Sequence, residues 1–247
     1  MIKSILGNVG SGKTASIVRY MRDHPYKIFV TNIDVKGKNF SHVIKLKANM
    51  IIKKEVTSIK KNGEENFKLS LNIDFWKELL KKHKTLNVVI DEAHIFFNPR
   101  RSMSKLNILM TDFLALLRRV LGSSDGTGEL ILITQLSRRL DIIAKEMTNE
   151  VTYCIHHFIT YCKKCGLSWQ ESNEDADRTE LCPECNSYHL GRRNSTIEIY
   201  KFTDFESFEM WSATGQKSYF KRYLITDIED IFGNYETLQF NDLFTEY

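Results

Sequence analysis

The stretch GNVGSGKT, from Gly7 to Thr14, decides the fold of this chain. It fills every fixed position of the phosphate-binding loop pattern G-x-x-x-x-G-K-[ST]. Ile2, Ile5 and Leu6 precede it as a short apolar run typical of a buried strand, and residues 15–21 carry apolar side chains at helical spacing. Strand, glycine-rich loop and helix start is the order that a triphosphate site requires. The sequence therefore predicts an α/β fold that binds a nucleoside triphosphate.

Each residue type in the loop has a chemical reason. Glycines let the backbone wrap around phosphate oxygens and present several N–H donors at once. The ammonium of Lys13 is expected on the outer phosphates and the hydroxyl of Thr14 on Mg²⁺, and the positive end of the helix dipole is expected to favour the phosphates as well. The predicted nucleotide-binding residues of the loop are Gly7, Asn8, Val9, Gly10, Ser11, Gly12, Lys13 and Thr14.

Length and composition limit the number of domains. The chain has 247 residues, 42% hydrophobic and 27% charged, which suits one α/β domain with a small added module. No apolar run is long enough to cross a bilayer, and the chain enters its first strand directly, so we expect neither a membrane helix nor a signal peptide. Four of the five cysteines form two C-x-x-C pairs, which favours reducing, intracellular surroundings.

Positive charge is concentrated in one segment. The net charge is +4, and residues 36–84 hold thirteen lysines against five acidic residues. Such a segment can face a polyanion or can simply be a solvated surface, and the sequence leaves both open. Within it, we predict a lysine-rich β-hairpin insertion over residues 42–72.

A second part of the nucleotide site is expected after the strand at residues 86–90. This apolar run ends in Asp91 and Glu92, as buried parallel strands deliver carboxylates to their carboxyl edge. Asp91 is predicted to hold Mg²⁺, directly or through water. Glu92 is placed to take a proton from an attacking water, so the pattern favours hydrolysis over transfer to a small acceptor.

A third strand, residues 129–134, ends on Gln135. A polar residue there can contact the γ-phosphate or the attacking water. An amphipathic helix over residues 106–121 precedes this strand. One arginine is expected to reach a neighbouring subunit's site and stabilise transition-state charge. We assign this role to Arg119; the competing candidates are Arg100, Arg101, Arg118, Arg138 and Arg139.

Four cysteines have the spacing of a structural zinc site. Cys162 and Cys165 form one C-x-x-C pair, Cys182 and Cys185 another, with sixteen residues between the pairs. Four thiolates close the coordination sphere, so the metal is expected to hold a small fold together and not to catalyse. A disulfide pair and four idle thiols are the alternatives. The module, residues 161–194, interrupts two predicted strands, residues 150–160 and 195–202, and is therefore expected at the tip of a β-hairpin.

The order of these motifs resembles the HerA/FtsK superfamily of DNA-pumping ATPases. GNVGSGKT is followed by VVIDEAH, by LLRRVLGSSDGTGELILITQLSRRLD and by MTNEVTYCI. Arg119, Gly122, Gln135, Arg138 and Asn149 stand at places that match that superfamily's pattern. DEAHIFFNPR, LITQ and the closing RYLITDIEDIFGNYET resemble the zonular occludens toxin-like branch, which includes filamentous phage assembly proteins and viral packaging ATPases.

The resemblance implies a three-layer P-loop fold of the RecA/FtsK kind with a central, mostly parallel sheet, formed by residues 1–160 and 195–247, with the zinc ribbon inserted. It implies ATP-driven translocation of double-stranded DNA, most simply viral genome packaging, by a ring oligomer, a hexamer by analogy. A capsid or other assembly protein would be a partner, and the location would be the host cytoplasm or the virion. Filamentous-phage members usually carry a transmembrane segment after the ATPase region, which this chain lacks, so the resemblance favours a packaging motor.

Other functions remain open at this stage. One is an assembly or secretion ATPase that acts on protein partners through its zinc ribbon and moves no DNA. Another is a nucleic-acid-binding protein whose nucleotide site only switches conformation. Residues 91–94 spell the DEAH box of RNA helicases, but those enzymes need two recombinase-like lobes, which do not fit in this length.

Overall fold

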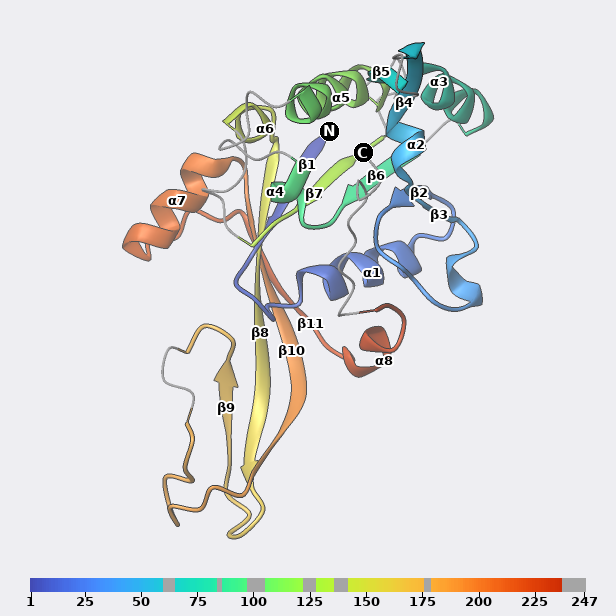
Figure 1. Cartoon of the computed structure of the whole chain (residues 1–247). Coiled ribbons are helices and arrows are strands. Elements are labelled where there is room, and N and C mark those ends of the chain that lie inside the picture. Colours follow the sequence, from blue (N-terminus) through green and yellow to red (C-terminus); the bar gives the residue numbers. More distant parts are fainter. Residues whose placement is uncertain are drawn as a thin grey trace.

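The strands of this chain form one large sheet and one separate hairpin. The computed structural model describes residues 1–59, 65–83, 86–96, 105–121, 128–135, 142–175 and 179–236. The strands of the large sheet are β1 (Ile2–Leu6), β2 (Ile28–Thr31), β3 (Val43–Lys45), β6 (Leu86–Ile90), β7 (Leu130–Ile133), β8 (Glu150–Cys162), β9 (Ser168–Ser172), β10 (Leu190–Phe202) and β11 (Lys221–Ile225). Their order is β11-β10-β8-β1-β7-β6-β2-β3, with β9 paired to the far part of β8 (Figure 1).

The centre of this sheet is parallel. All neighbours from β8 through β1, β7, β6 and β2 to β3 are parallel, while β9, β10 and β11 are antiparallel to their neighbours. The apolar run of β6 is buried along its whole length, as expected of a parallel strand covered on both faces. The predicted mixed α/β fold with a mostly parallel central sheet is confirmed. Its carboxyl ends meet at one edge, where the motifs lie.

Helices cover both faces of the sheet (Figure 1). One core contains Ile17 and Val18 of the first helix and Ile231 near the C-terminus, and the other contains Trp76 and Phe113. The arrangement therefore has three layers. The helices are α1 (Lys13–Asp23), a 3-10 turn (Lys38–Phe40), α2 (Ala48–Ile51), α3 (Ile73–Lys82), α4 (Ala93–Phe96), α5 (Lys105–Leu121), α6 (Ile142–Glu146), α7 (Phe205–Thr214) and α8 (Glu229–Phe232).

The lysine-rich hairpin is shorter than the sequence predicts. It consists of β4 (Ile52–Ile59) and β5 (Glu65–Leu71), which pair with each other and not with the large sheet. The predicted range, 42–72, also includes β3, which pairs in parallel with β2. The boundary was therefore wrong at its N-terminal end. Three residues, the last of them Lys45, give too weak a strand pattern to reveal this edge strand, which pairing with β2 stabilises.

The strands β8 and β10 form a long antiparallel ribbon that leaves the sheet. Each has 13 residues, and their ladder runs from Val151 paired with Phe202 to Cys162 paired with Leu190. The predicted strands over residues 150–160 and 195–202 are confirmed, and both are longer. Residues 157–175 and 179–194, here called the arm, comprise the far part of this ribbon, β9 and the four cysteines, and the arm projects beyond the helical layers (Figure 1).

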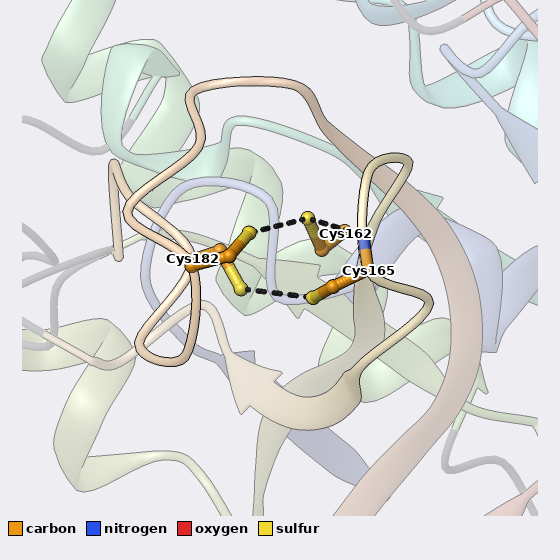
Figure 2. A group of neighbouring side chains, drawn as sticks. Cys162, Cys165 and Cys182 are labelled. Carbon is orange, nitrogen blue, oxygen red and sulfur yellow. Dashed lines mark hydrogen bonds between the residues drawn. The ribbon is translucent and has the colours of Figure 1, made fainter.

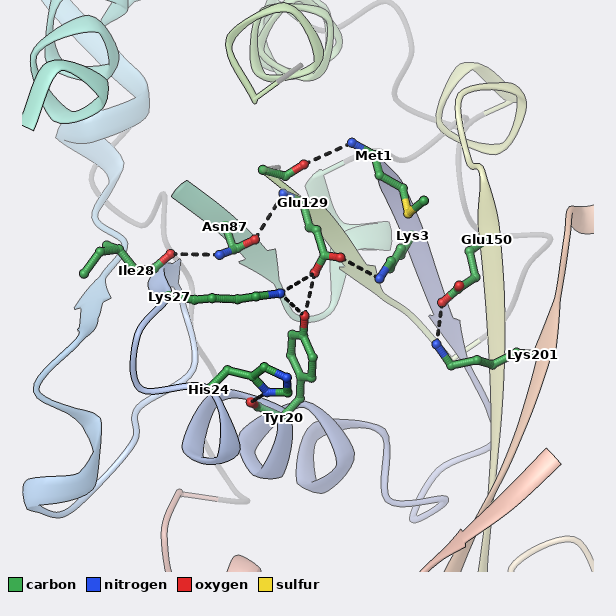
Figure 3. A network of polar contacts seen from close by, with 11 residues as sticks. Met1, Lys3, Tyr20, His24, Lys27, Ile28, Asn87, Glu129, Glu150 and Lys201 are labelled. Atoms are coloured by element: carbon green, nitrogen blue, oxygen red, sulfur yellow. Dashed lines mark hydrogen bonds and ion pairs between the residues drawn. The ribbon is translucent and has the colours of Figure 1, made fainter. Parts of the chain in front are cut away.

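A polar network ties the strands together at the edge opposite the carboxyl ends (Figure 3). Glu129 accepts hydrogen bonds from Lys3 Nζ at 2.7 Å and from the Tyr20 hydroxyl at 2.9 Å. Burial favours a raised pKa for Glu129, but the hydrogen bonds from Lys3 and Tyr20 together with the charges of Lys3 and Lys27 outweigh it, and the pKa is lowered. The side chain of Asn87 donates to Ile28 O at 3.3 Å and accepts from Glu129 N at 3.2 Å. This network helps set the register of β1, β6 and β7.

Within the part of the chain that the structure describes, no helix combines the length and apolar character needed to cross a lipid bilayer.

Candidate nucleotide and metal sites

The phosphate-binding loop connects β1 to α1 with the geometry that its glycines permit. Gly10 and Gly12 have φ values of 75° and 81°, in the left-handed region that glycine adopts without strain. A Cβ on Gly7 would lie 2.3 Å from Ser11 Oγ and 2.7 Å from the carbonyl oxygen of Cys154. A Cβ on Gly12 would lie 2.5 Å from Ile197. Strands β8 and β10 therefore press against the loop, and two of its glycines are required for lack of space.

Replacing Gly7 with Ala is expected to lower the free energy of unfolding by about 3 kcal/mol, because the new methyl group overlaps backbone that cannot move aside. Gly10→Ala is the matched control, since nothing lies within 4 Å of its Cβ position and only the backbone cost of about 1 kcal/mol applies. Urea denaturation measures both. Equal losses would show that crowding by Cys154 and Ser11 does not restrict the loop.

The ammonium of Lys13 lies inside the loop. It is buried and donates hydrogen bonds to the carbonyl oxygens of Gly7 and Asn8, each at 2.9 Å. Burial lowers the pKa of Lys13, and the nearby carboxylates of Asp91 and Glu92 act in the opposite direction. The charge is thus held by weak carbonyl partners in the space that the loop encloses. Phosphate oxygens are stronger acceptors for such an ammonium.

Thr14 and Asp91 meet across the edge of the sheet. The Thr14 hydroxyl donates to Asp91 Oδ2 at 2.8 Å, joining the start of α1 to the end of β6. Burial raises the pKa of Asp91, which the hydrogen bond from Thr14 only partly opposes. A buried carboxylate beside a hydroxyl is a set of oxygen ligands that suits Mg²⁺, and a cation there would favour the charged carboxylate.

Asn32, which the sequence did not indicate, holds Asp91 in place from β2. Its side chain accepts from Asp91 N at 2.7 Å and donates to Asp91 O at 3.0 Å. This pair orients the backbone just where the carboxylate leaves the strand. No motif identifies an asparagine sixty residues upstream, because only the pairing of β2 with β6 brings it close.

Substituting Asn32 with Leu, of similar size, is expected to destabilise the protein by about 2 kcal/mol, because a backbone N–H and C=O lose their partners. Asn66→Leu, on the exposed hairpin, is the control. Chemical denaturation measures both variants. An unchanged midpoint for Asn32→Leu would mean that water replaces the clamp and that Asn32 does not position Asp91.

Glu92 is held from two sides. Gln135 Nε2 donates to Glu92 Oε1 at 3.1 Å, and His94 Nδ1 lies 3.2 Å from Glu92 Oε2. The hydrogen bond with His94, helped by that from Gln135, lowers the pKa of Glu92 although burial opposes it. The carboxylate therefore stays charged well below neutral pH, and the stabilisation it receives is lost only as the pH falls through this lowered pKa. A charged carboxylate can accept a proton from water.

Glu92 also has an unusual backbone, with φ at 52°. Non-glycine residues seldom adopt this conformation, and at functional sites it aims a side chain.

His94 had no assigned role in the sequence, where the DEAH spelling pointed to a different class of enzyme. Here it positions Glu92.

The arginine assignments remain predictions. Arg119 lies exposed on α5, which is compatible with contact to another subunit. Among the competing candidates, Arg100, Arg101, Arg138 and Arg139 lie outside the described residues, as does the side chain of Arg118. Of the other residues in the resemblance, Asn149 accepts a hydrogen bond from Ile2 N at 3.1 Å and so supports β1, and Gly122 lies outside the described residues.

The loop also contacts β8 through His156. Its Nδ1 lies 3.2 Å from Gly10 O, so Nδ1 carries the hydrogen in this contact. Burial lowers the pKa of His156 and favours the neutral ring. The backbone of His156 is paired twice with Asn173, which follows β9 in the arm. The arm and the phosphate-binding loop are thus joined through one histidine.

The four cysteines converge at the end of the arm. All four Sγ atoms lie within 4.8 Å of one another, with Cys162 and Cys185 at 3.6 Å and Cys165 and Cys182 at 3.5 Å (Figure 2). Tetrahedral zinc with bonds of about 2.3 Å places its sulfur ligands about 3.8 Å apart. The cluster therefore fits zinc, and none of the four cysteines is in a disulfide. The fifth cysteine, Cys154, is buried beside the loop, and burial raises its pKa to about 12.

The sheet and the loop define this chain as a P-loop protein of the mixed α/β class. A family model described as zonular occludens toxin (Zot) matches residues 1–202. The chain belongs to the Zot family. A comparison with curated proteins finds no match.

Two solved structures show the range of similarity. The N-terminal domain of zonular occludens toxin from Neisseria meningitidis is 16% identical, covering 95% of this chain and 98% of that one, with a TM-score of 0.48. The genome packaging NTPase B204 from Sulfolobus turreted icosahedral virus 2, in complex with AMPPCP, is 17% identical over 62% of this chain and 73% of its own, with a TM-score of 0.37. Similarity at this level transfers neither substrate nor partner to this chain.

Proposed function

We propose that this protein hydrolyses ATP and uses the energy to translocate DNA. The observation that carries the proposal is the convergence of three strand ends: the loop after β1, Asp91 and Glu92 after β6, and Gln135 after β7. These groups meet the requirements of hydrolysis, namely phosphate binding, a place for a metal, and a charged base with a partner.

In this mechanism, residues 7–14 bind the triphosphate and Lys13 exchanges its carbonyl partners for phosphate oxygens. Thr14 and Asp91 would hold Mg²⁺, which would supply charge neutralisation on the phosphates. Glu92 takes the proton from the attacking water. Gln135 contacts Glu92 in the present structure and is placed to sense the γ-phosphate and to relay its loss along β7.

A ring of identical subunits would complete the site. Arg119 is the proposed trans-acting group, because its exposed position on α5 leaves it available to a neighbour. A hexamer follows by family resemblance. The mass of the parent protein with ATP, measured by native electrophoresis or light scattering, tests the ring. Arg119→Ala tests the trans-acting role separately, and this variant is expected to lose hydrolysis while its ATP binding is unchanged.

The proposed substrate is double-stranded DNA, with viral genome packaging as the process. Thirteen lysines over residues 36–84 support a polyanionic partner. Capsid or assembly proteins are the proposed further partners. The proposed location is the host cytoplasm or the virion. The five cysteines, all free thiols, are compatible with a reducing compartment such as the cytoplasm.

The deciding experiment measures steady-state ATP hydrolysis with and without long double-stranded DNA over a range of salt concentrations. Stimulation that weakens as salt rises supports translocation, because phosphate contacts release counterions. Basal hydrolysis that DNA does not change would favour the assembly or secretion ATPase instead. The projecting arm makes protein docking the specific alternative in that case.

For the cysteines, we propose a structural zinc ribbon within residues 161–194. Four converging thiols support closed coordination, which leaves no position for a substrate. The metal would fix the two cysteine turns to each other at the end of the β8–β10 ribbon.

A further inference from the structure

The arm has one packed face and one open face. Side chains directly opposite each other in an antiparallel ladder share a face. In β8, Phe158, Thr160 and Cys162 are buried, whereas Tyr161 is exposed and Ile159 is half-buried. The even-numbered residues therefore face the cysteine loops, and the odd-numbered residues form the other face, here called the open face.

The outer part of the open face, beyond the row of His157 and Ser172, consists of two rows of side chains. The pairing of β9, β8 and β10 aligns Ser168, Tyr161 and Gly191 in one row, and Gln170, Ile159 and Arg193 in the next. Ser168, Gln170 and Arg193 are exposed. This is a flat, three-stranded surface with an aromatic residue at its centre.

The ring of Tyr161 reaches across the neighbouring strand and covers Gly191. A Cβ at Gly191 would come within 2.3 to 2.7 Å of three ring and hydroxyl atoms of Tyr161, so the absence of a side chain at Gly191 makes room for the ring. One ring face thus packs on backbone, while the side chain remains 38% exposed. A tyrosine ring that is held in place by backbone contact and is still partly exposed to solvent is preorganised for stacking.

Charge on the open face is positive. Arg193 is the one charged residue in the two rows, and the exposed Lys163 follows Tyr161 by two positions. By contrast, Arg192 belongs to the packed face, where it lies 3.5 Å from Glu171 and over the ring of Phe158. The exposed Glu174 and Asp175 come after the inner end of β9, Glu180 and Glu184 belong to the chain around the second cysteine pair, and Glu229 accepts a hydrogen bond from Asn194 N, so none of these acidic residues stands in the two rows.

We propose that the open face of the arm binds single-stranded nucleic acid, with a base stacked on Tyr161 and phosphates on Arg193 and Lys163. Stacking requires an unpaired base, whereas a duplex offers only its backbone and grooves to a flat surface. The inference goes beyond ATP-driven translocation, since it concerns a second site far from the phosphate-binding loop and needs no nucleotide.

Fluorescence anisotropy tests the proposal with the full chain, without ATP or Mg²⁺, on a labelled oligothymidylate of about 20 nucleotides and on a duplex of equal length. Tyr161→Leu is expected to weaken single-strand binding about tenfold, because it keeps an apolar cover over Gly191 but removes the aromatic face. Tyr161→Phe should bind normally. Arg193→Gln should weaken binding and reduce the salt slope by about 0.7.

Two matched controls belong to the test. Tyr188→Leu removes a tyrosine that is 76% exposed but outside the two rows, and Arg192→Gln removes the adjacent arginine of the packed face. Both should bind as the parent does. The proposal is overturned if folded Tyr161→Leu binds normally, if Tyr188→Leu loses as much as Tyr161→Leu, if the duplex binds more tightly than the single strand, or if neither nucleic acid binds.

Because no nucleotide is present, failure of ATP hydrolysis would leave this experiment unaffected. Conversely, loss of stacking on the arm would not remove the groups at the phosphate-binding loop. The two proposals therefore fail separately.

Discussion

ATP turnover is expected to fall by about a hundred- to ten-thousand-fold in Glu92→Gln, the range typical of losing a general base. Glutamine keeps the size of the side chain and can still contact Gln135, but it cannot accept a proton. ATP should remain bound, because Lys13 and the loop backbone provide the phosphate contacts. Steady-state turnover and binding of a fluorescent ATP analogue measure the two quantities separately.

The control is Glu146→Gln, an exposed glutamate on α6 outside the site, which should hydrolyse ATP at the parental rate. Near-normal turnover in Glu92→Gln would remove Glu92 as the base and leave hydrolysis, if present, without its proposed mechanism. Loss of ATP binding in the same variant would instead mean that Glu92 supports the loop.

Zinc content is expected to fall from about one ion per chain to none in Cys182→Ser, because serine does not replace a buried thiolate in a four-sulfur site. Cys182 is fully buried, so its replacement removes a sulfur ligand from the interior of the cluster. Elemental analysis of protein purified under reducing conditions measures the change. The thermal transition should also shift to lower temperature, since the cysteine turns lose their link.

Cys154→Ser is the matched control. It removes the cysteine that is buried beside the phosphate-binding loop and absent from the four-sulfur cluster, so its zinc content should equal that of the parent. Parental protein without zinc would refute the zinc ribbon. Loss of zinc from Cys154→Ser would show that the metal depends on the fold as a whole.

Local patterns predicted most of the nucleotide site. The loop from Gly7 to Thr14, the strand before Asp91 and the strand before Gln135 are all continuous in sequence, and their spacing has a direct physical meaning. Parallel strands bring their carboxyl ends to one edge, so the hydrogen bonds from Thr14 to Asp91 and from Gln135 to Glu92 follow from motif order plus a mostly parallel sheet.

Contacts between distant segments were not predictable in this way. Asn32 and His156 reach the site from positions that no motif marks, and the clash that requires Gly7 comes from the backbone of Cys154. Strand β3 escaped prediction because its three residues gain stability only from β2. Each depends on which strands become neighbours.

The amino-acid sequence by itself determined the class of this protein: a phosphate-binding loop, a carboxylate pair and a four-cysteine module, each written in residues close together along the chain. Only the tertiary structure decided how these parts are held. Burial and strand pairing determine which residues contact Asp91 and Glu92. They also place Tyr161 over Gly191, and they put Arg193 and Arg192 on opposite faces of the arm. Pairing across a sheet joins residues far apart in sequence, and it leaves no short-range pattern.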